Sequence, residues 1–148
     1  MSMGRILSAA DIAASGLAAE RTRMEVASGN IANAHATRTA TGGAYRRQQV
    51  VFESLLGDRG NLRKGSTDGL AGVRVEGIES DNSPLPLIHD PGHPDANAAG
   101  DVEMPNVQIP REMVDLLTAS RAYEANLKSL QTFQRMAEQA LGLLRGMR

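Results

Sequence analysis

The sequence of 148 residues predicts a mainly α-helical chain, with a long helix at each end and a small irregular middle region that contains short strands. Apolar residues repeat at helical spacing through the first thirty-four residues and again through the last forty. Five of the six Pro residues and ten of the fifteen Gly residues fall between these stretches, where long helices are disfavoured. We therefore divide the chain into residues 1–34, 35–108 and 109–148.

The N-terminal helix is predicted from two rows of apolar residues at seven-residue spacing. The first row is Met3, Ala10, Leu17, Met24 and Ile31, and the second is Ile6, Ala13, Ala27 and Ala34, interrupted by Glu20. Rows that alternate three and four residues apart form the stripe used in coiled-coil packing. Because the stripe is rich in Ala, a partner must approach closely. Gly29 weakens a helix, so a rigid, continuous helix is not expected through that position.

The C-terminal helix is predicted from about Pro110 to Arg145 by the same repeat. Its first row is Ile109, Leu116, Tyr123, Leu130, Ala137 and Leu144, and its second is Ala119, Phe133, Ala140 and Met147, with Asn126 as the polar exception. Pro110 suits a first helical turn, and Glu112 and Asp115 favour the positive N-terminal end. Asn126 is either tolerated polarity or a residue that fixes register and partner number.

The middle region contains two candidate strands. Residues 45–56, with Val50, Val51 and Phe52, fit a strand or the start of a short helix. Val73, Val75 and Ile78 alternate with charged residues and give a better strand signal. Four Pro residues punctuate residues 81–94, which predicts extended chain and tight turns there.

Composition limits the classes of function. Of the apolar residues, 21 are Ala, while Leu, Ile, Val and Phe together number 31, so we expect a thin core that neighbouring chains complete. A formal net charge of −1 argues against nucleic acid as the main partner. The apolar stretches are too short to span a bilayer, and the N-terminus lacks the pattern of a cleavable signal peptide.

Catalytic and metal-binding residues are not predicted. His89 and His93 lie near Asp90 and Asp95, but Pro91, Gly92 and Pro94 exclude the helix that would align both imidazoles, and a polar turn is the simpler interpretation. With no Cys and no nucleophile elbow, we expect no enzyme activity, no cofactor and no bound metal.

Charge is unevenly distributed in the middle of the chain. Residues 31–75 hold seven Lys or Arg against three acids, whereas residues 76–105 hold seven acids and no Lys or Arg. One hypothesis is that the basic span of one chain meets the acidic span of a neighbour, which would give register and specificity. Pairing of the same charges within one chain is the alternative.

Several motifs, which follow one another in a fixed order, resemble those of bacterial flagellar rod and hook proteins. Among these proteins, the resemblance is strongest to those of the proximal rod. The motifs are residues 14–26 (ASGLAAERTRMEV), 30–34 (NIANA), 41–48 (TGGAYRRQ), 72–75 (GVRV), 90–96 (DPGHPDA), 105–107 (PNV) and 120–126 (SRAYEAN). The resemblance extends over nearly the whole chain, from about Ile6 to Leu144.

The resemblance implies a subunit of the drive-shaft rod that crosses the periplasm. It implies that the terminal helices pair as an antiparallel coiled coil around the export channel, with residues 35–108 outside. The implied partners are other copies, proximal and distal rod proteins, the rod–MS-ring junction protein and the flagellar type III export apparatus, which accepts unfolded chains without a cleavable signal. Neither nucleic acid nor membrane insertion is implied.

Interface residues are the functional residues expected of such a subunit. Those predicted are Leu17, Met24, Asn30, Ile31, Asn33, Tyr45, Arg46, Arg47, Leu116, Tyr123, Asn126, Leu130 and Phe133. A second hypothesis is that Asn30, Asn33 and residues 45–47 fix the turn that leaves the first helix, because Gly42 and Gly43 permit unusual φ.

Three alternative functions compete with that of a proximal-rod subunit. They are another rod or hook subunit, a soluble helical adaptor or export chaperone, and a metal enzyme using His89 and His93.

Overall fold

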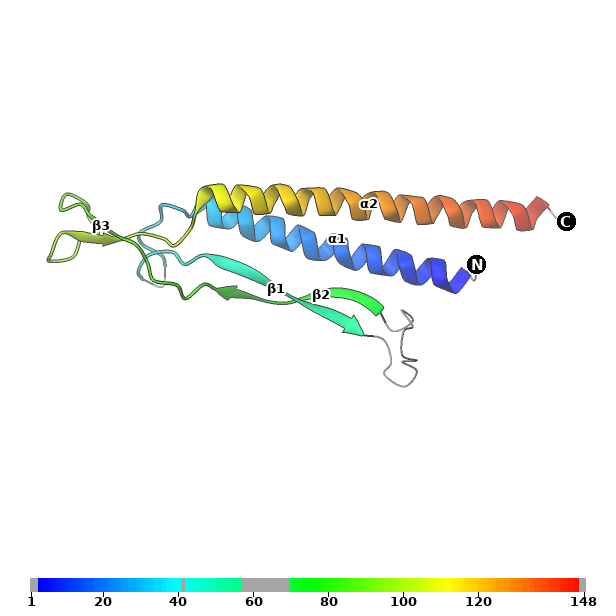
Figure 1. Ribbon diagram of the computed structural model, residues 1–148, viewed down its shortest axis with the longest axis horizontal. Helices are drawn as coiled ribbons and strands as arrows, with labels where there is room; N and C mark the ends of the chain where they lie inside the picture. The colour runs from blue at the N-terminus through cyan, green and yellow to red at the C-terminus, as the bar shows by residue number, and fades with distance from the viewer. Residues whose placement is uncertain (1–2, 41, 57–69, 147–148) are drawn as a thin grey trace. The chain divides into compact units, whose positions relative to one another are not determined.

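The computed structural model describes residues 3–40, 42–56 and 70–146, and it has a long helix near each end with a small β-containing region between them (Figure 1). This confirms the predicted fold class at that level. The elements are α1 (Met3–Ala32), β1 (Gln48–Leu56), β2 (Leu70–Ser80), β3 (Leu87–His89), β4 (Asp101–Glu103) and α2 (Ile109–Gly146). The chain divides into a first unit of residues 1–22, 52–76 and 119–148 and a second unit of residues 23–51 and 77–118.

Helix α1 runs through Gly29 without interruption, so the sequence-based argument against a continuous helix at that residue is wrong. One Gly costs a helix about 0.5–1 kcal/mol relative to Ala, which the burial of Ala27 and Asn30 on either side offsets. The helix instead gives way to a turn after Ala32, where the Asn33 amide N–H and the Asn33 Nδ2 both donate to the Gly29 carbonyl, at 3.1 and 2.8 Å.

Helix α2 begins one residue before the predicted start and reaches Gly146. Pro110 lies in its first turn, as predicted, where the missing N–H costs no helical hydrogen bond. Glu112 lies in the same turn, and its N–H donates to the Gln108 carbonyl at 3.1 Å.

The structure resolves the ambiguity at residues 45–56 in favour of a strand. Strand β1 pairs with β2 in a two-stranded sheet, and their arrows point in opposite directions in Figure 1. Val73 and Val75 are half-buried and alternate with exposed charged residues, as predicted. Ile78 also lies in β2, but it is exposed, because Gly77 occupies the inward position that follows Val75.

A second, smaller sheet pairs β3 with β4 in antiparallel register, with Leu87 opposite Glu103, Ile88 opposite Val102 and His89 opposite Asp101. Strand β3 falls within the stretch predicted to be extended. Strand β4 was not predicted, because three residues with a single apolar side chain carry no periodic signal.

Alanine dominates the core among the described residues. The buried apolar residues there are Ala13, Ala19 and Ala119 in the first unit, and Ala27, Ala34, Ala44 and Val102 in the second. The second apolar row of α1 is therefore the more deeply buried one, whereas Leu17, Met24 and Ile31 of the first row are only half-buried. This agrees with the expectation of a thin core. Within the described parts of the chain, neither helix has a stretch long and apolar enough to cross a bilayer.

Candidate functional site

Helices α1 and α2 approach closely in the first unit. A Cβ added at Gly16 would lie 2.8 Å from Nδ2 of Asn126, so glycine leaves the space that the asparagine side chain occupies. Beside this contact is a hollow of about 360 Å³, lined by Ile12, Phe52 and Val73 among others. The close approach is the one that the small residues of α1 predict. Of the residues predicted to form an interface, Leu17, Tyr123, Asn126, Leu130 and Phe133 are half-buried here.

Strand β2 is anchored to α1 through Ser15 in the same unit. The Ser15 Oγ donates to the Ile12 carbonyl at 2.7 Å and accepts the Val73 N–H at 3.1 Å. Gly72 has φ of +124°, a backbone conformation that favours glycine, and a Cβ there would overlap Ser15 Oγ. Both the backbone conformation and the short distance to Ser15 therefore require glycine at this position. Sequence reasoning missed this anchor because the partners are far apart in the chain.

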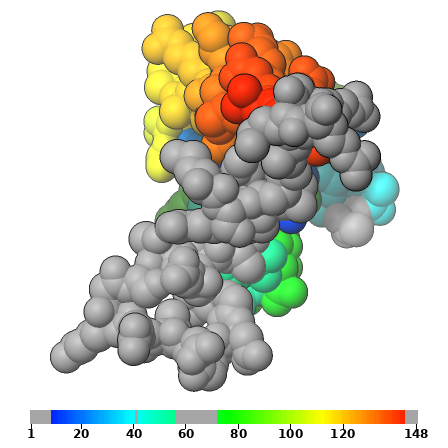
Figure 2. All heavy atoms as spheres, turned by 90° about the vertical axis from the view of Figure 1, so that its right-hand side faces the viewer, coloured from blue at the N-terminus to red at the C-terminus, as the bar shows by residue number. Residues whose placement is uncertain are grey.

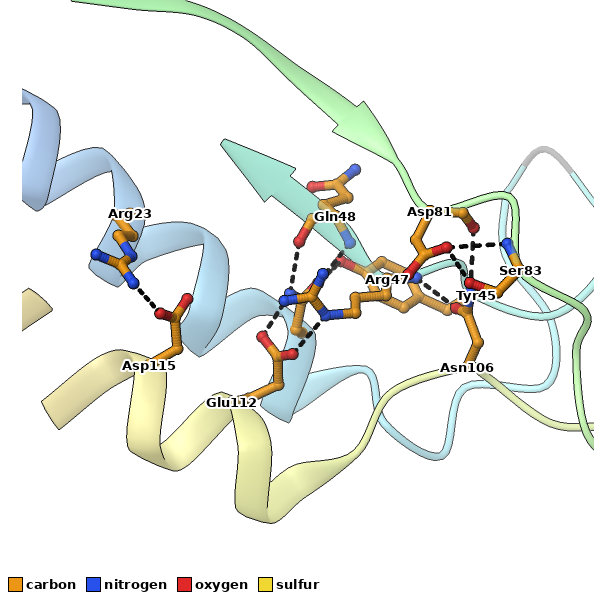
Figure 3. Close-up of polar contacts among 10 residues, drawn as sticks. Arg23, Tyr45, Arg47, Gln48, Asp81, Ser83, Asn106, Glu112 and Asp115 are labelled. Carbon is orange, nitrogen blue, oxygen red and sulfur yellow. Dashed lines mark hydrogen bonds and ion pairs between the residues drawn. The ribbon is translucent and has the colours of Figure 1, made fainter. Parts of the chain in front are cut away.

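A buried polar cluster organises the second unit, and Figure 3 shows Tyr45, Arg47 and Glu112 of this cluster. Its centre is Asn30. The Asn30 side chain is fully buried, and its Nδ2 donates to the Gln48 carbonyl and to Glu112 Oε2, each at 2.8 Å. Its Oδ1 accepts the Tyr45 hydroxyl at 3.0 Å and the Gln48 N–H at 2.9 Å. All four hydrogen-bonding positions of the amide are therefore occupied within the chain.

Glu112 and Arg47 form a buried ion pair in this polar cluster. The Glu112 side chain is 1% exposed, and its Oε1 accepts Arg47 Nε at 2.6 Å while its other oxygen accepts Asn30. Sequence reasoning placed Glu112 only at a favourable helix end, because its partner lies 65 residues away. A carboxylate this deeply buried is tolerated because it is both paired and hydrogen-bonded.

Tyr45 closes one side of the cluster. Burial raises the pKa of its phenol above the ordinary value of 10.0, and the nearby Glu112 carboxylate raises it further. The phenol is therefore held in the neutral form, in which its hydroxyl donates to Asn30.

Asn106 connects the cluster to the segment after β2. Its Oδ1 accepts the Arg47 N–H at 2.7 Å, and its Nδ2 donates to the Asp81 carbonyl at 3.1 Å. The Asp81 carboxylate accepts both the Ser83 hydroxyl and the Ser83 N–H. These hydrogen bonds are the main cause that lowers the pKa of Asp81, and the charges of Arg47 and Arg111 lower it further.

A further ion pair joins the helices in the second unit, where Arg23 of α1 contacts Asp115 of α2. Both side chains are about one-third exposed, which leaves the pair partly screened by water. Met24, Ile31 and Leu116, also predicted at an interface, are half-buried in this unit.

The turn that follows α1 adopts the backbone expected of its glycines. Gly42 and Gly43 have φ of +87° and +74°, which confirms that expectation. The Thr39 N–H donates to the Gly43 carbonyl at 2.9 Å, and the Tyr45 N–H donates to the Ala36 carbonyl at 2.9 Å. Arg46 is exposed and donates to the Ser83 carbonyl at 3.3 Å.

The basic and acidic spans meet within the chain at one described ion pair, Arg38 with Asp95 at 3.7 Å. Thr37 Oγ1 also donates to Asp95 at 2.8 Å, beside a hollow of about 480 Å³. Part of the charge is thus paired internally, as the alternative hypothesis has it. Arg59, Arg63 and Lys64 lie outside the described residues.

His89 and His93 hold different partners. His89 Nδ1 is 2.9 Å from Asp101 Oδ1, and His93 Nδ1 accepts the Asp95 N–H at 3.1 Å. In the portion of the chain that the structure describes, no three His, Asp or Glu side chains gather to hold a metal ion. The pair of imidazoles serves the turn between β3 and β4.

Large apolar side chains remain exposed in both units. Those in the second unit are Ile78, Leu87, Ile88, Met113, Val114 and Leu117, and those in the first are Ile12, Phe52, Leu127, Leu141 and Leu143. Figure 2 shows atoms of α2, yellow to red, at the surface of the face that it presents. The exposed residues of α2 lie outside the two heptad rows, so the sequence pattern did not identify them as candidate contacts.

Comparison with known proteins finds two family models. The model described as "Flagella basal body rod protein" matches residues 11–41, and the model described as "Flagellar basal body rod FlgEFG protein C-terminal" matches residues 98–143.

Relatives named "Flagellar basal-body rod protein FlgC" match along almost their full length. The protein from Borreliella burgdorferi is 43% identical over 150 residues, covering 95% of this chain and 99% of the relative. The Salmonella typhimurium protein is 39% identical, covering 93% and 97% of the two chains. The Bacillus subtilis protein is 39% identical, covering 88% and 93%.

Proposed function

This chain belongs to the FlgC family of flagellar basal-body rod proteins, and on that premise we propose that it is a proximal-rod subunit. It is a structural protein rather than an enzyme. Copies assemble helically into the drive shaft that transmits torque across the periplasm and encloses the export channel. The observation that carries the proposal is identity of 39–43% over nearly the entire length of the relatives.

In this proposal α1 and α2 pair as an antiparallel coiled coil that forms the rod core, with residues 35–108 outside it. Within the second unit, Asn30 contacts Glu112 and the earlier Arg23 contacts the later Asp115. The residue with the lower number on α1 therefore contacts the residue with the higher number on α2, as in a pair of antiparallel helices. Within the first unit, Gly16 lies against Asn126. The two contacts of the second unit support opposite helix directions there.

Assembly supplies the apolar burial that one chain lacks. The buried apolar residues in the described parts are six Ala and one Val, while several Leu, Ile, Val and Met side chains are exposed. Burying apolar surface contributes roughly 25 cal/mol per Å², so covering these side chains against neighbouring subunits favours the polymer. The half-buried Leu17, Met24, Tyr123 and Phe133 are proposed to contribute to the same contacts.

The polar cluster has an internal role in this proposal. Asn30, Tyr45 and Arg47 are half-buried or buried and bind partners in their own chain. Their hydrogen bonds and the ion pair fix the register of α1, α2 and β1 before a neighbour binds. These residues therefore determine how the interface residues are positioned within the chain, in addition to any contact that they make with another subunit.

The proposed location is the periplasmic rod, reached through the flagellar type III export apparatus. The proposed partners are copies of this chain, proximal and distal rod proteins and the rod–MS-ring junction protein. Heterologous contacts that do not close into a ring produce the helical filament that a rod requires.

Quantitative mass spectrometry of hook–basal bodies, isolated from detergent-solubilised cells, tests the proposal. We expect the chain in fixed proportion to other rod proteins and enriched near the membrane-embedded base. A matched preparation from cells that lack the chain provides the control for carry-over. Absence from intact basal bodies, with the chain soluble in the cytoplasm, would instead support an adaptor or export chaperone.

A further inference from the structure

We propose that the start of α2 in one subunit binds the β3–β4 hairpin of a second copy of this chain. The inference rests on the proposed function, because it specifies one contact by which the rod subunits assemble. It joins two exposed apolar surfaces that the described chain leaves uncovered.

The first surface, the α2 apolar face, consists of Met113, Val114 and Leu117. Their side chains are between 53% and 64% exposed. Leu117 lies four residues after Met113 and three after Val114, so it is the helical neighbour of both, and the three form a continuous strip. Arg111 is exposed and lies three residues before Val114, which places a positive charge at the edge of this strip.

The second surface, the hairpin face, centres on Leu87 of β3 and Glu103 of β4. Leu87 is 62% exposed, and it lies directly opposite exposed Glu103 in the antiparallel pair. Residues that are directly opposite share one face of a sheet. His89 and Asp101 form the next pair on that face. The hairpin face therefore presents one large apolar side chain beside negative charge.

Complementary charge indicates that each surface fits the other. An apolar strip edged by Arg111 matches an apolar side chain edged by Glu103, and a two-stranded hairpin gains stability when it packs against a helix. Both surfaces are exposed in the described chain, so neither covers the other within one molecule. Two different surfaces on every subunit make a head-to-tail contact, which repeats indefinitely when its rotation does not close.

Disulfide cross-linking in isolated basal bodies tests this contact, because the chain has no Cys of its own. Cells producing both Leu87→Cys and Val114→Cys chains should yield a dimer linked through those positions. Val114→Cys with Ala98→Cys, an exposed position in the hairpin turn, is the matched control. We expect at least about tenfold less product in the control, since a disulfide needs Cα atoms within about 7 Å.

A charge exchange provides an independent test that changes no apolar contact. Glu103→Arg alone and Arg111→Glu alone should each lower incorporation into basal bodies by about tenfold, because each places like charges together. A mixture of the two variant chains should restore incorporation, because every contact in an alternating assembly is again between opposite charges. Circular dichroism of each purified variant verifies that its helices are retained.

The possible results separate this inference from the proposed function. The 87–114 cross-link together with restoration in the mixture supports the contact. A dominant 87–87 or 114–114 product, or no restoration although the unaltered chain is stoichiometric in basal bodies, overturns the contact and leaves the rod assignment intact. Absence of the unaltered chain from basal bodies overturns the rod assignment itself.

Discussion

The two units of this chain hold their helices by different means. In the second unit a buried amide, an ion pair and a phenol specify contacts that are directional and mutually dependent. In the first unit the contacts depend on closeness, with Gly16 against Asn126 and Gly72 against Ser15. A polar cluster fixes register, because displacement by one residue leaves buried groups unpaired, whereas small-residue packing sets how near two elements lie.

Removing Glu112 should produce the largest effect on this comparison. Glu112→Leu leaves the buried Arg47 and Asn30 without their shared acceptor, and loss of one partner of a buried pair costs about 3–5 kcal/mol. Urea unfolding of the purified chain, followed by circular dichroism, measures the change in free energy of unfolding. Asp115→Ala removes the partner of the more exposed Arg23 and should cost less than about 1 kcal/mol. Equal losses in the two variants would contradict the importance given to burial.

The turn after α1 should be the next most sensitive feature. Gly42→Val together with Gly43→Val forces two β-branched residues into left-handed backbone at about 1–2 kcal/mol each. We expect a lower urea midpoint and impaired swimming in soft agar. Unchanged motility would show that this turn does not position Tyr45 and Arg47 for the polar cluster.

Gly72 and Gly29 should respond to alanine with opposite signs. Gly72→Ala, in the first unit, combines strained backbone with overlap on Ser15 and should destabilise the chain by about 1–3 kcal/mol. Gly29→Ala, in the second, meets no atom within 4 Å and should stabilise α1 by about 0.5–1 kcal/mol. The two midpoints of thermal unfolding should therefore move in opposite directions, and a shared direction would refute this distinction.

The smallest expected effect concerns alkaline pH. Because the pKa of Tyr45 is raised in the folded chain, its stabilising contribution is complete below the ordinary value of 10.0. That contribution is lost as pH rises through the higher folded pKa. Tyr45→Phe removes the hydrogen bond to Asn30 at a cost of about 0.5–1.5 kcal/mol near neutral pH. The variant should lose less stability than the unaltered chain when pH is raised past 10.0.

The sequence predicts the helices of this chain better than it predicts their contacts. Heptad spacing locates α1 and α2 because periodicity is a local property of each helix. The ion pair of Glu112 and Arg47 cannot be predicted from a single sequence, because the two residues are 65 positions apart and no local pattern indicates that they meet. Asn30 appears in the pattern as a polar residue near a helix end, and only the fold shows that its own chain occupies every hydrogen-bonding position.

The strands are also predicted only where a local pattern marks them. The alternation of Val73 and Val75 predicts β2, whereas β4 is too short to show any alternation and forms because β3 offers it a partner. The exposed strip at Met113, Val114 and Leu117 lies between the heptad rows, so a search for rows passes over it. A surface that awaits a neighbour is visible only after the internal contacts of the chain are known.

The alanine core has a mechanical consequence. An alanine side chain has no torsion that can change its shape, so ordering it on folding costs no rotamer entropy. For the same reason, it has no alternative rotamer to adopt when mechanical force is applied to the protein. The buried alanines, which are Ala13, Ala19 and Ala119 in the first unit and Ala27 in the second, therefore give the helices that carry them few ways to yield under twisting. Residues that contribute little to the stability of an isolated chain thus give stiffness to a shaft that must carry torque.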